Sequence, residues 1–122
     1  MSTYAAPNAY RDGAVLTASP VGLVVLLYDG IGRFLRQAAA ALEAGDTTTA
    51  SARMQRAEAI ISELVVTLDH ERGGEIAARL EAIYLFWRRH LDAARIERDP
   101  AKVLDVVRQA AELRQAYAAI GT

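Results

Sequence analysis

The sequence lacks cysteine altogether, which excludes disulfide bonds, thiolate metal sites and cysteine nucleophiles. It has only three prolines among 122 residues, at positions 7, 20 and 100. None of these prolines interrupts a long periodic segment, and alanine is abundant throughout the chain. The sequence therefore favours long, unbroken helices.

A secretory signal and a membrane span are also missing. The first ten residues, MSTYAAPNAY, have neither a basic start nor a continuous apolar segment. The most apolar run, residues 21–28, is far shorter than the roughly 20 residues that cross a bilayer. We therefore expect a cytoplasmic protein with no membrane insertion.

No charge of either sign dominates. The chain has 14 lysines and arginines against 15 aspartates and glutamates, a formal net charge of −1. Binding to nucleic acid or to an anionic membrane needs a basic surplus or a basic patch, so neither is expected. Hydrophobic residues make up 52% of the chain, which is long enough for one domain with one core.

What the sequence does have is four segments with helical periodicity. The predicted helices cover residues 19–44, 46 or 47–68, 75–98 and 100–120. Caps support these ends, because Ser19-Pro20 and Asp99-Pro100 suit helix starts and Gly45 suits a helix end. Short connections make successive helices antiparallel neighbours. The prediction is an all-α, antiparallel up-down four-helix bundle over residues 19–122, preceded by a short arm over residues 1–18 with a possible helical turn.

Apolar stripes at spacings of three and four predict which side chains form the core. In the first two helices the stripes are Val24, Leu27, Ile31, Phe34 or Leu35, Ala38 and Leu42, then Ala50, Met54, Ala57, Ile61, Leu64 and Leu68. In the last two they are Ile76, Leu80, Ile83, Trp87, Leu91 and Ala94, then Val103, Val106, Ala110, Leu113, Tyr117 and Ile120. The pair Gly73-Gly74 is the strongest turn signal in the chain and is expected to separate the second helix from the third.

The first predicted helix has one anomaly. Its later turns have a polar side, but its first two turns place Val21, Val25 and Leu26 on or beside that same side. These apolar side chains have three possible explanations. They are exposed singly on the surface, or the arm covers them through Tyr10 and Leu16, or a partner protein covers them. A groove between helices is able to accept an amphipathic helix from another protein.

No catalytic pattern emerges from the titratable residues. Asp69, His70, Glu71 and Glu75 cluster around the glycine pair, where a solvated turn is the simpler interpretation. His90 lies in the middle of a predicted helix, as in histidine-phosphotransfer bundles, but the lysine and glycine expected after such a histidine are absent. We expect no metal site and no enzyme.

Several motifs in this order resemble one known family. They are Tyr10, TASP (17–20), LLYDG (26–30), ALEAGD (41–46), RAEAIISELVVTLD (56–69), GGEIAARL (73–80) and ELRQAY (112–117). Together they resemble the bacterial flagellin export chaperone family, FliS, from about residue 10 to residue 120.

The resemblance implies a cytosolic four-helix bundle without cofactor or catalysis. It implies two partners: the C-terminal segment of flagellin, which the chaperone would keep from polymerising prematurely, and the flagellar type III export apparatus. We expect a monomer or weak dimer. The residues predicted to contact flagellin are Tyr10, Val21, Val25, Leu26, Tyr28, Asp29, Ile60 and Leu64, with the arm as a possible lid.

Two other hypotheses stay open from the residues alone. A histidine-phosphotransfer bundle would use His90 as the phosphorylated group. A structural homodimer would use the apolar patch of the first helix as a self-interface.

Overall fold

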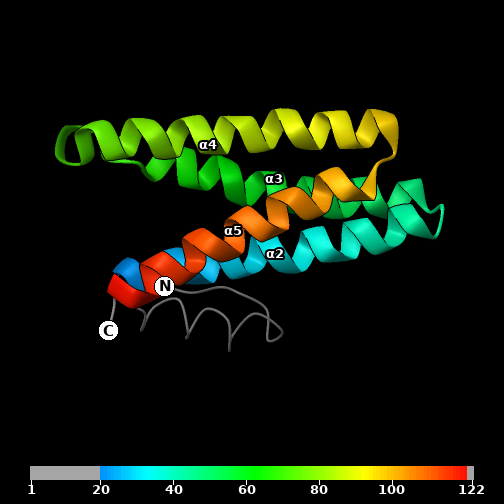
Figure 1. The fold of residues 1–122 in the computed structure, drawn as a ribbon, viewed down its shortest axis with the longest axis horizontal. Coiled ribbons are helices and arrows are strands. Elements are labelled where there is room, and N and C mark those ends of the chain that lie inside the picture. Colours follow the sequence, from blue (N-terminus) through cyan, green and yellow to red (C-terminus); the bar gives the residue numbers. More distant parts are fainter. Residues whose placement is uncertain (1–19, 121–122) are drawn as a thin grey trace, which may run out of the picture.

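The computed structural model describes residues 20–120, and within this range all secondary structure is helical. The helices are α2 (Pro20–Glu43), α3 (Thr47–Thr67), α4 (His70–Glu97) and α5 (Pro100–Ile120). They run up and down in turn, and α2 contacts α3 and α5, which both contact α4. The start of α2 and the end of α5 therefore lie at the same end of the bundle (Figure 1). The predicted all-α four-helix bundle is confirmed. The arm, Tyr10 and the Ser19 cap lie outside the described residues.

The helix ends follow the local signals in the sequence. The Asp46 carboxylate accepts a hydrogen bond from the Thr49 backbone N–H at 3.1 Å, as an N-cap of α3 does. Gly45, at the end of α2, has a φ of 79°, a left-handed conformation that costs glycine little. The Asp99 carboxylate caps α5 in the same way, by accepting from the Ala101 N–H at 2.9 Å.

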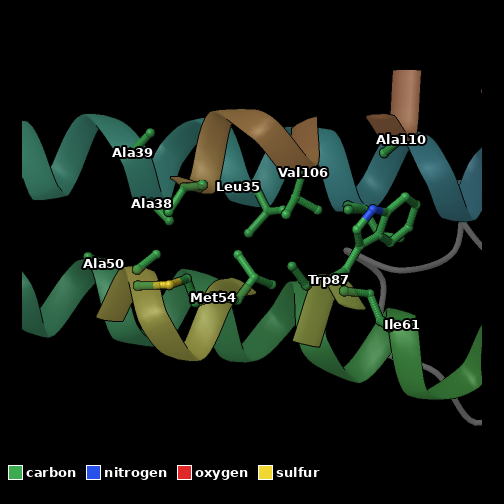
Figure 2. Close-up of a cluster of buried hydrophobic side chains, with 14 of the residues drawn as sticks. Leu35, Ala38, Ala39, Ala50, Met54, Ile61, Trp87, Val106 and Ala110 are labelled. Carbon is green, nitrogen blue, oxygen red and sulfur yellow. The ribbon is translucent and has the colours of Figure 1, made fainter. Parts of the chain in front are cut away.

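The core lies between the α2–α5 pair and the α3–α4 pair. Figure 2 shows Leu35 and Val106 on one side of this interior, with Met54 and Ile61 on the other and Trp87 reaching between the pairs. All five side chains are at most 1% exposed. The Trp87 indole Nε1–H donates to the Gln109 side-chain oxygen at 2.8 Å, so its polar atom is satisfied at the core boundary.

The third helix begins earlier than predicted, and the turn predicted at the glycine pair is present as a break in helical geometry within it. The chain leaves α3 at Leu68 and α4 already begins at His70, because the Asp69 carboxylate caps it by accepting from the Arg72 N–H at 3.1 Å. The glycine pair makes a kink inside α4 instead of a connection, since Gly74 has non-helical angles of φ 49° and ψ −121°.

The apolar stripes predict burial incorrectly for two residues at the end of the bundle. Ile76 and Ile120, both predicted to be buried, are 69% and 72% exposed. Ile76 comes two residues after the Gly74 kink, and Ile120 is the last residue of α5. At this end the four helices do not close over a shared interior, so the periodic pattern continues beyond the core that it predicts.

Candidate binding surface at the open end of the bundle

An apolar recess of about 400 Å³ opens at the end of the bundle that holds the start of α2 and the end of α5. All four helices contribute to its walls. Its lining residues are Val24, Leu64, Thr67, Leu68, Asp69, Arg72, Gly73, Ile76, Ala77, Leu80, Tyr84 and Tyr117. Most of these side chains are apolar, and the charged groups, Asp69 and Arg72, belong to the turn where α3 passes into α4. We call this feature the end recess.

Exposed apolar side chains stand around the end recess. Ile76 is 69% exposed and lines it, while Val66, in the last turn of α3, is 78% exposed. Leu26, on the second turn of α2, is 39% exposed. Apolar surface gathered at one end of a small protein is typical of an interaction site.

The predicted contact residues of α2 lie on two edges of this helix. Val21 and Val25 are half-buried in its first two turns, and the exposed Leu26 lies on the edge that leads towards α3. Ile60 of α3 is half-buried, and its Cδ1 would lie 2.9 Å from a Cβ atom added at Gly30. The structure thus brings Leu26 and Ile60 to neighbouring helices at the same open half of the bundle.

Tyr28 and Leu64 lie beneath the surface. Tyr28 is 1% exposed, and its hydroxyl is hydrogen-bonded to the hydroxyl of Tyr84 at 2.5 Å. Leu64 is 3% exposed and forms part of the recess wall. In this conformation both residues support the surface from below.

Two residues that line the end recess, Tyr84 and Tyr117, belong to an aromatic cluster that continues into the core through Tyr28 and Trp87. The Tyr28 ring lies 5.6 Å from the Tyr117 ring and 6.3 Å from the Trp87 ring, measured between centroids. Burial raises the pKa of the Tyr28 hydroxyl far above its usual range, and the hydrogen bond with Tyr84 raises it further. Burial likewise raises the pKa of Tyr84. The tyrosine pair is therefore neutral at physiological pH and acts as a polar link between α2 and α4.

Asp29 already has a partner within the chain. Its carboxylate accepts a hydrogen bond from the Arg114 Nε–H at 2.9 Å, which joins the second and third turns of α2 to α5. Both side chains are partly exposed, so the pair contributes little to stability. It fixes the α2–α5 edge next to Val25, which lies one turn before Asp29.

Sequence reasoning missed several residues of the end recess. Val24, Leu80 and Tyr117 were assigned to the core stripes and in fact form the recess walls. A stripe predicts the side of a helix that packs inward, and it gives no information about how far four helices diverge at their ends. The Gly73-Gly74 pair was a signal available in the sequence, in addition to the apolar first turns of α2, since a kink there alters the first turns of α4.

The two histidines lie in ordinary helix environments. The His90 side chain is 19% exposed, and its Nε2 atom lies 3.0 Å from an Asp105 carboxylate oxygen. Phe86 stacks on the same ring at 4.9 Å. This histidine faces α5 and is enclosed by protein, which disfavours the phosphotransfer hypothesis. Between residues 20 and 120, no three His, Asp or Glu side chains gather closely enough to hold a metal ion.

Hydropathy along the described helices is too low for a membrane span in any of them. The fold and site define a small helical bundle with an apolar recess that opens at one end.

Comparison with known proteins identifies the family of this bundle. Residues 2–122 match the family described as Flagellar protein FliS. The chain is 32% identical over 117 residues to the flagellar secretion chaperone FliS of Campylobacter jejuni, covering 96% of this chain and 91% of that protein. It is 34% identical over 110 residues to the FliS chaperone of Bacillus subtilis, covering 90% and 81%. The Salmonella typhimurium chaperone of the same name is 35% identical over 96 residues, covering 78% and 71%.

The chain belongs to the FliS family of flagellar secretion chaperones. The resemblance seen in the sequence motifs is thereby confirmed. FliS is a chaperone family and not an enzyme family, so this protein is not an enzyme.

Proposed function

We propose that this protein binds the C-terminal segment of flagellin in the cytoplasm, keeps it from polymerising, and delivers it to the flagellar export apparatus. Membership of a flagellar secretion chaperone family supports the role. The observation that carries the site is the end recess, about 400 Å³ in volume, with the exposed Ile76 at its wall and Leu26 nearby on α2.

Apolar burial supplies the binding energy in this proposal. A flagellin segment that is unstructured when free loses conformational entropy when it binds, and buried apolar surface must offset this loss. Each 100 Å² of apolar surface removed from water contributes about 2.5 kcal/mol. The open end offers such surface on Val21, Val25, Leu26 and Ile60, and within the end recess itself.

Seven of the eight predicted contact residues lie in the described range and divide into two groups under this proposal. Val21, Val25, Leu26 and Ile60 are accessible enough to contact the client directly. Tyr28, Asp29 and Leu64 hold the shape of the surface, through the tyrosine pair, the link to Arg114 and the recess wall. Tyr10 belongs to the proposed arm, whose displacement by flagellin stays a prediction.

Two isoleucines of the same helix provide a matched test. Ile76 and Ile96 are 69% and 82% exposed on α4, but only Ile76 lines the end recess. We expect Ile76→Asp to weaken binding of the flagellin C-terminal segment by about tenfold or more, because a charge would be desolvated in the apolar interface. Ile96→Asp is expected to leave the affinity within about twofold of the unchanged protein. Isothermal titration gives both values.

Circular dichroism is the control for folding, and because both side chains are exposed we expect both variants to keep their helical content. Equal affinities for the two variants would rule out the end recess as the binding site. Light scattering on the free protein addresses the homodimer hypothesis: a stable dimer that flagellin fails to dissociate would mean that the apolar end is a self-interface.

A further inference from the structure

Two arginines from neighbouring helices share one aromatic ring. The guanidinium carbon of Arg33 on α2 lies 5.2 Å from the Phe34 ring centroid, and that of Arg56 on α3 lies 5.0 Å from it. Cations at such distances are attracted by the ring quadrupole. Phe34 is half-buried against the core, so it holds two like charges close together on the surface between α2 and α3.

Neither of these arginines has an acidic partner among residues 20–120. Other arginines in this range do pair, as Arg95 with Glu58 at 3.0 Å and Arg114 with Asp29 at 2.9 Å. What sets Arg33 and Arg56 apart from the remaining unpaired arginines is the Phe34 ring that both contact. Arg53, one turn before Arg56 on the same exposed edge of α3, also lacks an acidic partner there. Glu63 is the acidic residue of this edge, two turns beyond Arg56. The surface around Phe34 thus has a local positive charge that the chain does not neutralise.

This basic surface continues the apolar one. A Cβ atom added at Gly30 would lie 2.9 Å from Ile60 Cδ1 and 3.9 Å from an Arg33 guanidinium nitrogen. Ile60, Gly30, Arg33, Phe34 and Arg56 therefore form one unbroken strip along the α2–α3 junction, which we call the α2–α3 strip. It is apolar towards the open end of the bundle and basic towards its middle.

We propose that the α2–α3 strip binds a protein segment that has apolar side chains next to acidic ones, and that this segment belongs to flagellin. The inference rests on the proposed function and adds to it a charge requirement. The client's apolar side chains lie over Gly30 and Ile60, and its carboxylates accept hydrogen bonds from Arg33 and Arg56.

The positive charge of the strip indicates which kind of segment binds there. Guanidinium groups form paired hydrogen bonds to carboxylates, and stacking on Phe34 already restricts the two arginine side chains, which lowers the entropy lost on binding. The N-terminal segment 1–19 has one acid, Asp12, and one base, Arg11, so it has no net negative charge to place there. An acidic segment of another protein fits the strip better than this chain's own N-terminal segment.

The test compares two charge-matched double variants of the full chain. Arg33→Gln/Arg56→Gln removes the strip's cations, whereas Arg88→Gln/Arg89→Gln removes two exposed arginines of α4 that have no acidic partner among residues 20–120. Isothermal titration with the flagellin C-terminal segment is run at about 50 mM and about 300 mM salt. We expect the strip variant to lose about fivefold to twentyfold in affinity at low salt and to lose most of its salt dependence. The control variant is expected to match the unchanged protein.

A second titration uses an altered peptide, which makes the experiment a double-mutant cycle between the two arginines and the acidic residues of the client. When the client's aspartates and glutamates are replaced by their amides, the unchanged protein should lose affinity and the strip variant should lose no more. Equal affinities for the strip variant and the unchanged protein would overturn the inference, as would a strip variant that turns a dimer into a monomer while binding the client normally. Absence of binding by the unchanged protein would instead contradict the proposed function.

Discussion

At the scale of single residues, the buried pair of Tyr28 and Tyr84, of which Tyr84 lines the end recess, is the most specific feature. Tyr28 and Tyr84 are each 1% exposed, and their hydroxyls satisfy one another inside an otherwise apolar interior. Removal of one hydroxyl would leave the other buried without a partner, whereas removal of both would leave none. The pair joins α2 to α4, which face one another across the bundle.

The pair makes stability sensitive to alkali. In the folded protein burial raises the pKa of both hydroxyls above the ordinary 10.0, so the unfolded chain loses these protons first. The contribution of these two tyrosines to the free energy of unfolding is therefore fully present below about pH 10 and falls as the pH rises further, by up to about 1.4 kcal/mol per pH unit for each tyrosine.

Urea denaturation between about pH 8 and pH 11 measures this slope. The double variant Tyr28→Phe/Tyr84→Phe should show a shallower fall, because it removes both titrating groups while keeping the rings. Val106→Ala serves as the control, since it destabilises the core without altering a tyrosine. If the free energy of unfolding fell equally steeply with pH in the double variant and the unchanged protein, the tyrosine pair would not be the cause of the loss of stability at high pH.

At the scale of helices, local signals predicted most of the ends. Asp46, Asp99 and Gly45 acted as the sequence indicated, because a cap depends on a few neighbouring residues and their backbone angles. The Gly73-Gly74 pair breaks the helical geometry where the sequence indicated, but the break is a kink inside α4, because the Asp69 cap had already started this helix.

Arg98, the C-cap of α4, allows a test of how backbone strain at a helix end affects stability. It ends α4 in a left-handed conformation with a φ of 55°, a position that glycine usually occupies. The Asp99 N–H donates to the Ala94 carbonyl at 3.0 Å across this turn, so the backbone geometry is fixed. We expect Arg98→Gly to stabilise the protein by about 0.5–1 kcal/mol, because the strain at the β-carbon disappears. Thermal and urea unfolding measure the change.

The matched control is Gly45→Ala, at the end of α2. Gly45 has a φ of 79° and an open surrounding, so alanine would meet strain but no steric clash. This variant should destabilise the protein by about 1 kcal/mol. Loss of stability in Arg98→Gly would mean that the arginine side chain contributes more than its backbone strain costs.

At the scale of the whole molecule, the bundle was predictable and its open end was not. Periodicity identified the inward side of each helix, and Leu35, Trp87 and Val106 are buried as expected. The exposure of Ile76 depends on how four helices diverge beyond the last shared core layer, which no single segment encodes. The anomaly in the first turns of α2 was the sequence's one sign of an unusual surface there.

We propose above all that apolar burial at this open end drives client binding. The most direct test is the heat-capacity change of binding, from titrations of the full chain with the flagellin C-terminal segment at several temperatures. The account predicts a large negative value, corresponding to roughly 1,000–3,000 Å² of buried surface. Tight binding with a heat-capacity change near zero would contradict it, because the interaction would then be polar and the apolar end would stay exposed.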